Sequence, residues 1–122
     1  MNSGSAARET FSRDDRLRKR REFEECYASG VRVSGRLLQV FLRPGKKRLR
    51  IGISVPRRVG NAARRNRLRR RIREIFRRNR DLFEQGCATL VVHVRPAAAA
   101  ASFAELSEEY RKSVGRGLSK TR

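Results

Sequence analysis

The sequence predicts an α+β fold in which helices pack on a small sheet. Three observations support this prediction. The chain has 122 residues, which suits one domain, and 38% of them are hydrophobic, which is enough for a modest core. The predicted elements follow one another as a helix, a run of strands, a helix, a strand and a helix. Residues 1–15 are polar and are expected to form a flexible basic extension, and residues 119–122 a tail.

The first predicted element is a helix over residues 20–28. Gly30 is expected to end this helix in a left-handed conformation, which costs glycine little. Phe23 and Tyr27 lie four positions apart in the sequence, so their side chains share one face of the helix.

Strands are predicted from residue 31 onward, because hydrophobic and polar side chains begin to alternate there. Within residues 38–43, one alternate set is entirely aliphatic and is expected to face the core. Phe41 then lies on the opposite face, together with Gln39 and Arg43. Its polar neighbours favour an exposed ring at this position.

Further strands are predicted over residues 51–55 and 88–95, where hydrophobic side chains alternate again. Residues 44–47 indicate a hairpin turn before the first of these strands. The alanine run 97–101 is expected to be a connector rather than a helix, because Pro96 precedes it.

A long helix is predicted over residues 62–79, with Asn61 as its N-cap. Four hydrophobic side chains fall within an arc of about 100° on this helix; they are Leu68, Ile72, Ile75 and Phe76. The opposite side is polar and basic, and carries Asn66, Arg70, Arg73 and Arg77. The helix is therefore expected to pack one face on the sheet and to present the other to a partner.

The C-terminal helix is expected to begin after Ser102. Ser102 and Glu105 match a capping box, in which each side chain accepts a hydrogen bond from the other residue's backbone N–H. A hydrophobic stripe follows from Phe103, and Gly115 and Gly117 are expected to stop the helix.

The positive charge of the chain is concentrated in its centre. The sequence contains 32 Lys and Arg residues, 27 of them Arg, against 12 acidic residues, which gives a formal net charge of +20. Residues 57–80 contain 12 basic residues and one acidic residue, a net charge of +11. A charge this dense favours an anionic partner, and the planar guanidinium group suits phosphate.

The sequence offers little for catalysis by the protein itself, and no catalytic residue or metal site is predicted. His93, the single histidine, lies in a predicted strand. Cys26 and Cys87 have no second histidine to complete a nucleophilic site, and both are interpreted as small, partly buried side chains. No hydrophobic stretch could span a bilayer or serve as a signal core. We therefore expect a cytoplasmic protein that does not bind membranes.

Nucleic-acid binding is the function that the residues favour. Phe23, Tyr27 and Phe41 lie among basic residues, and aromatic rings combined with positive charge are typical of surfaces that bind single strands. The pattern alone does not distinguish RNA from DNA.

The segment 50–70 resembles the signature of the bacterial ribonuclease P protein family. Its centre is Arg-Asn-Arg at positions 65–67, which is similar to the family's RNR motif, and Gly60 and Ala62 precede it at the family's spacing. Further similarity on both sides extends the resemblance to about residues 16–118.

The resemblance implies an α/β sandwich with about four strands, in which the arginine-rich helix follows an unusual left-handed crossover. It also implies an accessory subunit of ribonuclease P. A large RNA with catalytic Mg²⁺ ions carries the active site and removes the 5′ leader of precursor tRNA. The residues implied to bind this RNA subunit are Arg57, Arg58, Arg65, Asn66, Arg67, Arg69, Arg70 and Arg73. Those implied to line a cleft for the single-stranded leader are Phe23, Tyr27 and Phe41. No obligate protein partner is expected.

Two other functions remain open on the residues alone. A structural ribosomal or architectural nucleic-acid protein accounts for the charge, but not for the ordered match from Gly60 to Arg73. A helix-turn-helix DNA-binding protein needs two short adjacent helices, and the strand predicted before Gly60 argues against it.

Overall fold

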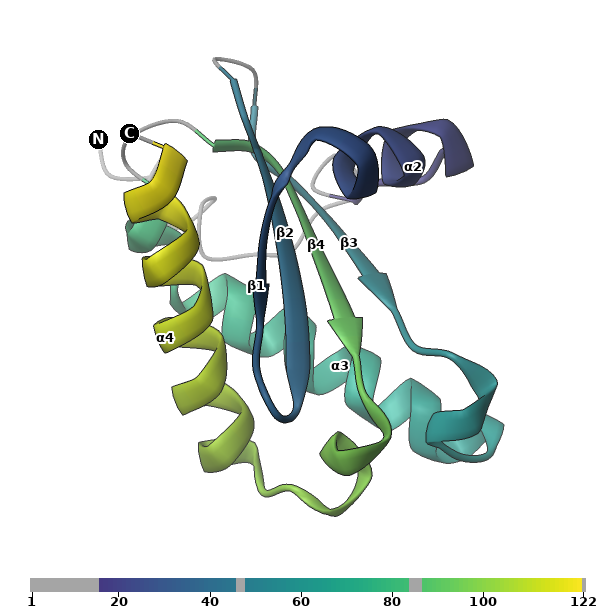
Figure 1. Cartoon of the computed structure of the whole chain (residues 1–122). Helices are drawn as coiled ribbons and strands as arrows, with labels where there is room; N and C mark the ends of the chain where they lie inside the picture. Colours follow the sequence, from purple (N-terminus) through teal and green to yellow (C-terminus); the bar gives the residue numbers. More distant parts are fainter. Residues whose placement is uncertain (1–15, 46–47, 84–86, 122) are drawn as a thin grey trace, which may run out of the picture.

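A computed structural model describes residues 16–45, 48–83 and 87–121. It contains a four-stranded sheet in the order β1-β2-β4-β3 (Figure 1). The strands are β1 (Val31–Ser34), β2 (Leu38–Pro44), β3 (Arg50–Ser54) and β4 (Cys87–Val94). β2 pairs antiparallel with β1 and with β4, whereas β3 and β4 are parallel. The predicted α+β fold is confirmed, and the predicted extension over residues 1–15 lies outside the described residues.

The hairpin predicted at residues 44–47 is wrong in its pairing. β2 and β3 are not neighbours, because β4 lies between them and is hydrogen-bonded to both. The side chains of β4 explain its central place: Val91 on one face and Val92 on the other are both fully buried. A strand that is hydrophobic on both faces is typical of the centre of a sheet.

Hydrophobic clusters lie on both faces of the sheet. The larger cluster joins the aliphatic side chains of β2 to the helices α3 (Ala62–Arg78) and α4 (Phe103–Thr121). The smaller cluster contains Phe41 and Val91, which pack against Cys26 of the helix α2 (Arg20–Ser29). In Figure 1, α3 passes behind the strands and α4 lies along the left-hand side. The alternation predicted for β2 is confirmed, with Phe41 on the face opposite the main core.

The predicted C-terminal end of α2 and the predicted N-terminal end of α3 have different outcomes. Gly30 closes α2 with φ −80° and ψ 160°, so the predicted left-handed conformation is wrong. A side chain is excluded there for another reason, because a Cβ on Gly30 would lie 2.5 Å from the carbonyl oxygen of Cys26. The predicted N-cap of α3 is confirmed: Asn61 Oδ1 accepts a hydrogen bond from the Arg64 N–H at 2.9 Å.

The capping box of α4 is confirmed. The Ser102 N–H donates to Glu105 Oε1 at 2.8 Å, and the Glu105 N–H donates to Ser102 Oγ at 3.1 Å. The prediction that Gly115 and Gly117 stop the helix is wrong, since α4 continues to Thr121 and includes most of the expected tail. Gly117 packs directly against the Leu42 side chain of β2, which brings the helix close to the sheet.

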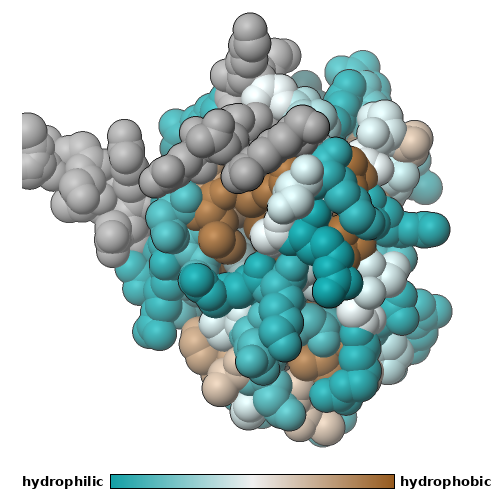
Figure 2. All heavy atoms as spheres, turned by 60° about the vertical axis from the view of Figure 1, so that its left-hand side comes forward, coloured by the Kyte–Doolittle hydropathy of each residue, from teal (hydrophilic) through white to brown (hydrophobic). Residues whose placement is uncertain are grey.

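Within the described residues, short 3-10 helices connect the main elements: η2 (Arg57–Val59), η3 (Arg80–Phe83) and η4 (Pro96–Ala100). The alanine run connects β4 to α4 as predicted, but the expectation that it is not helical is wrong, because Pro96 lies in the first turn of η4, where its missing N–H costs nothing. On the side of the molecule that carries α4, hydrophilic residues form most of the visible surface (Figure 2). Among the described residues, no helix has both the length and the hydrophobicity to cross a membrane.

Candidate nucleic-acid interface

All eight residues predicted to bind an RNA subunit lie on η2 and α3, directly after β3. Val59 of η2 is buried in the main core, which fixes the turn and leaves Arg57 and Arg58 exposed on its outer side. On α3, the four buried residues are those predicted, Leu68, Ile72, Ile75 and Phe76. Because they hold one face of α3 against the sheet, the arginines point away from it.

Four of the predicted residues surround one hollow on α3. Asn66, Arg69, Arg70 and Arg73, together with Ala63, line a space of about 460 Å³. Arg69 Nη1 donates a hydrogen bond to Asn66 Oδ1 at 3.0 Å, so the amide fixes the direction of this guanidinium group. Ala63 contributes only a methyl group to this lining. The arrangement offers several positively charged donors to one anionic group.

The basic surface is larger than the helix alone. Burial lowers the pKa of Arg73, and the nearby positive charges of Arg16 and Arg69 lower it further. Arg16 reaches this place because it bridges to Ile51 at the edge of β3, where its carbonyl oxygen accepts a hydrogen bond from Arg50 Nη2 at 3.2 Å. Sequence reasoning did not single out Arg16 as a site residue, since this pairing joins segments far apart in the chain.

The remaining arginines of this surface differ in their freedom. Arg65 Nε donates to the Gly60 carbonyl oxygen at 3.1 Å, so this side chain is tied to the loop before α3. Arg57, Arg58, Arg67 and Arg70 are exposed, and they form no hydrogen bond or ion pair with other described side chains. These four can turn toward a ligand without breaking an existing contact.

The three aromatic residues predicted to line a cleft lie together between α2 and the sheet. The ring centroids of Phe23 and Tyr27 are 6.5 Å apart, and those of Tyr27 and Phe41 are 4.7 Å apart. Their exposure differs: Tyr27 is 38% exposed, whereas Phe41 is only 8% exposed. The expectation of an exposed Phe41 is wrong because α2 covers it, so Tyr27 presents the main accessible ring.

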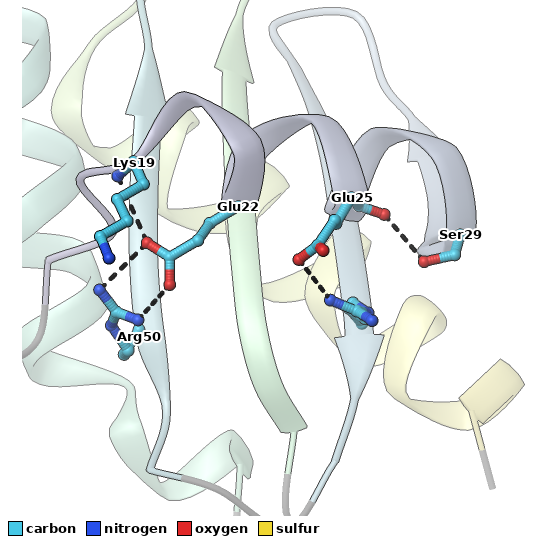
Figure 3. A network of polar contacts seen from close by, with 6 residues as sticks. Lys19, Glu22, Glu25, Ser29 and Arg50 are labelled. Carbon is cyan, nitrogen blue, oxygen red and sulfur yellow. Dashed lines mark hydrogen bonds and ion pairs between the residues drawn. The ribbon is translucent and has the colours of Figure 1, made fainter.

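Two ion pairs hold α2 over the sheet (Figure 3). Glu22 accepts hydrogen bonds from both Nη atoms of Arg50, at 2.5 and 3.3 Å, and from the Lys19 N–H at 3.3 Å. Burial tends to raise the pKa of Glu22, but these hydrogen bonds lower it below its ordinary value. Glu25 pairs with Arg43 of β2 at 3.0 Å. Both pairs join α2 to the strands beneath it and fix the position of the aromatic rings.

A polar row crosses the same face of the sheet, next to the row that contains Phe41. Register and alternation place Ser34, Gln39, His93 and Ser54 side by side in this row. Gln39 Nε2 donates to Ser34 Oγ at 2.9 Å. Burial lowers the pKa of His93, and the positive charges of Arg58 and Arg95 add to this effect. Sequence reasoning missed this row because only the sheet order brings its members together.

Comparison with known proteins assigns the chain to a family. Residues 11–117 match the family model described as Ribonuclease P. The ribonuclease P protein component of Desulfosudis oleivorans is 44% identical over 98 residues, which is 80% of each chain. That of Acidothermus cellulolyticus is 41% identical over 107 residues, covering 83% of this chain and 86% of the relative.

A solved structure agrees with both matches. The ribonuclease P protein from Thermotoga maritima superposes with a TM-score of 0.74 at 33% identity, covering 83% of this chain and 96% of the other. The sequence matches and the fold therefore lead to the same conclusion. The chain belongs to the ribonuclease P protein family, whose members are protein subunits of the ribonuclease P endoribonuclease.

Proposed function

We propose that the chain binds the catalytic RNA subunit of ribonuclease P through η2 and α3, and the single-stranded 5′ leader of precursor tRNA through the aromatic surface that α2 forms beside the sheet. It thereby assists the Mg²⁺-dependent removal of the leader. One observation carries this proposal: β3 links two surfaces of different chemistry, an aromatic one beside the middle of the strand and a basic one after its end. Gly52 contacts Phe23 in the aromatic cluster, and the strand leads directly into η2 and α3.

The surface on α3 suits a folded RNA. Several guanidinium groups converge on the hollow lined by Asn66, Arg69, Arg70 and Arg73, where they can form paired hydrogen bonds with phosphate oxygens. Neutralising phosphates releases the counterions that surround the RNA, and this release favours binding most strongly at low salt.

The aromatic surface at α2 suits a single strand, because an unpaired base can stack on an exposed ring. Tyr27 offers such a ring, and Phe23 and Phe41 hold it from below. The polar row beside it, with Gln39 and His93, offers hydrogen-bonding groups to the base edges or the sugar.

The Mg²⁺ ions are assigned to the RNA in this proposal. The described carboxylates do not suit a protein-held ion: Glu22, Glu25 and Glu74 accept hydrogen bonds from arginines, and no three acidic, histidine or cysteine side chains gather in the described ranges. The contribution of this chain is to reduce the repulsion between the phosphates of the RNA subunit and those of its substrate.

The test is reconstitution of cleavage at low Mg²⁺ from the protein, a bacterial ribonuclease P RNA and a precursor tRNA with a 5′ leader. Cleavage that requires both protein and RNA supports the proposal. Binding of the native RNA without any stimulation of cleavage would instead favour the structural nucleic-acid protein. Cleavage by the protein alone would contradict the assignment of the active site to the RNA.

The binding surface is tested separately by the salt dependence of RNA affinity. Arg69→Ala, Arg70→Ala and Arg73→Ala should each flatten the slope of log K against log salt by about 0.9 for every lost phosphate contact. Arg116→Ala on α4 is the matched control, since Arg116 is exposed and lies outside the proposed surface. Equal slopes for all four variants and the unaltered protein would remove α3 from the interface.

A further inference from the structure

We infer that Glu74 limits the RNA-binding face of α3 to the N-terminal part of the helix and thereby restricts binding to unrelated RNA. This inference rests on the proposed function, because it concerns the extent of the same surface. α3 spans Ala62–Arg78, and Glu74 is its single acidic residue.

Glu74 is bound on both oxygens by the two arginines that follow it. Arg77 Nε donates to Oε1 at 3.0 Å, and Arg77 Nη2 donates to Oε2 at 2.6 Å. Arg78 Nε donates to Oε2 at 2.7 Å. These hydrogen bonds lower the pKa of Glu74 to about 2, so the carboxylate stays ionised at any pH at which RNA is handled. Its negative charge is a permanent feature of the helix.

The two parts of α3 therefore differ in charge, although both are rich in arginine. Residues 64–73 contain seven arginines and no acidic residue. Beyond them, the basic side chains are engaged within the protein. Arg78 also lies over the ring of Phe103 at 5.5 Å, and Arg80 lies over the ring of Phe76 at 4.9 Å.

This difference in charge sets the point along α3 at which the surface that attracts RNA phosphates ends. A helix with uniform charge along its length accepts phosphates in several registers, because every turn is equally attractive. At Arg77, the guanidinium group already donates its hydrogen bonds to the Glu74 carboxylate. A phosphate placed there would also be repelled by the negative charge of that carboxylate. The favourable registers are those centred on the hollow around Arg70. Folded RNA that matches this register gains more than unrelated RNA.

The experiment compares Glu74→Gln with Glu108→Gln. Both variants remove one negative charge, but Glu108 lies on α4, where it pairs with Lys112 at 4.0 Å. Binding is measured for ribonuclease P RNA and for an unrelated structured RNA over a series of salt concentrations. Glu74→Gln should steepen the slope for the unrelated RNA by about 1 to 2 and raise its affinity roughly two- to fivefold, the size of one or two exposed ion pairs.

A second variant links this effect to the released arginines. The double variant Glu74→Gln, Arg77→Ala should lose most of the increase in slope that Glu74→Gln alone produces. Identical slopes for Glu74→Gln and Glu108→Gln would overturn the inference, since net charge would then explain both. A different result would contradict the proposed function: Arg70→Ala would leave the salt dependence of RNA binding unchanged. The melting temperature of Glu74→Gln is the control for folding. If it is unchanged, the altered RNA binding does not come from a loss of protein stability.

Discussion

The ring of Tyr27 meets the ring of Phe41 edge to face, with 4.7 Å between the ring centroids and 82° between the planes. One ring belongs to α2 and the other to the central part of the sheet, so this contact joins the two walls of the aromatic cluster. The two rings differ in exposure, and we therefore expect them to have different roles. The buried ring of Phe41 supports α2, and the exposed ring of Tyr27 is left for a ligand.

Tyr27→Ala and Phe41→Ala should therefore have different effects. Tyr27→Ala is expected to weaken binding of precursor tRNA with a leader by about 1–3 kcal/mol, and to leave binding of leader-free tRNA unchanged. Phe41→Ala should lower the free energy of unfolding by about 3–5 kcal/mol, because it opens a cavity beneath α2. Binding titrations with both substrates and denaturant unfolding measure the two effects. Equal losses on both substrates for Tyr27→Ala would contradict a leader-binding role.

The two glycines within α4 should respond oppositely to alanine. A Cβ on Gly115 meets no atom within 4 Å, so Gly115→Ala should stabilise the protein by about 0.5–1 kcal/mol through helix propensity. A Cβ on Gly117 would meet Leu42, which is fully buried and cannot move aside, so Gly117→Ala should destabilise. Thermal unfolding of the two variants tests this prediction. A higher melting temperature in both would contradict it and show that α4 can shift on the sheet.

Glu109 holds the turn between β1 and β2 from α4. Its Oε2 accepts hydrogen bonds from the Leu37 and Leu38 N–H groups at 2.7 and 2.6 Å. Removing a charged acceptor from two backbone donors in Glu109→Ala should lower the free energy of unfolding by about 2 kcal/mol. Glu108→Ala is the control, because the neighbouring carboxylate makes only a long ion pair on the surface. If both variants unfold at the same denaturant concentration, solvent replaces the lost acceptor at no cost.

His93 predicts how stability changes with pH. Burial and the positive charges of Arg58 and Arg95 lower its pKa in the folded protein below the ordinary value of 6.5. Below that pH, the unfolded chain binds a proton that the folded protein binds less readily, so stability is fully present above about pH 6.5 and is lost as the pH falls through it. His93→Gln should flatten this dependence below about pH 6.5, measured by denaturant unfolding. A steeper dependence would show that a folded-state partner favours the charged imidazole.

Local rules predicted the elements that depend on neighbours in the sequence. The hydrophobic spacing of α3, its Asn61 cap and the capping box at Ser102 are all confirmed, because each involves residues within one or two helical turns. The family resemblance added the site residues, and the structure brings Asn66, Arg69, Arg70 and Arg73 to one hollow.

The wrong predictions share another cause. Gly30 and Gly117 are small because of what lies across from them, namely the Cys26 carbonyl oxygen and the Leu42 side chain, and not because of local backbone geometry. Likewise, the burial of Phe41 and the insertion of β4 beside β2 depend on packing between distant segments. Alternation in one strand shows which face a residue occupies, but not what covers that face. The handedness of the crossover from β3 to β4 stays a prediction.

The parallel pairing of β3 with β4 has a mechanical consequence. Gly52, beneath Phe23, and Arg57, at the start of the basic surface, are five positions apart, a path of at most about 17 Å at the rise of a strand. Ladder hydrogen bonds hold much of this path in place. The two surfaces therefore keep a fixed spacing. Under the proposed function, this spacing sets the distance between the leader and the catalytic RNA where both contact the protein.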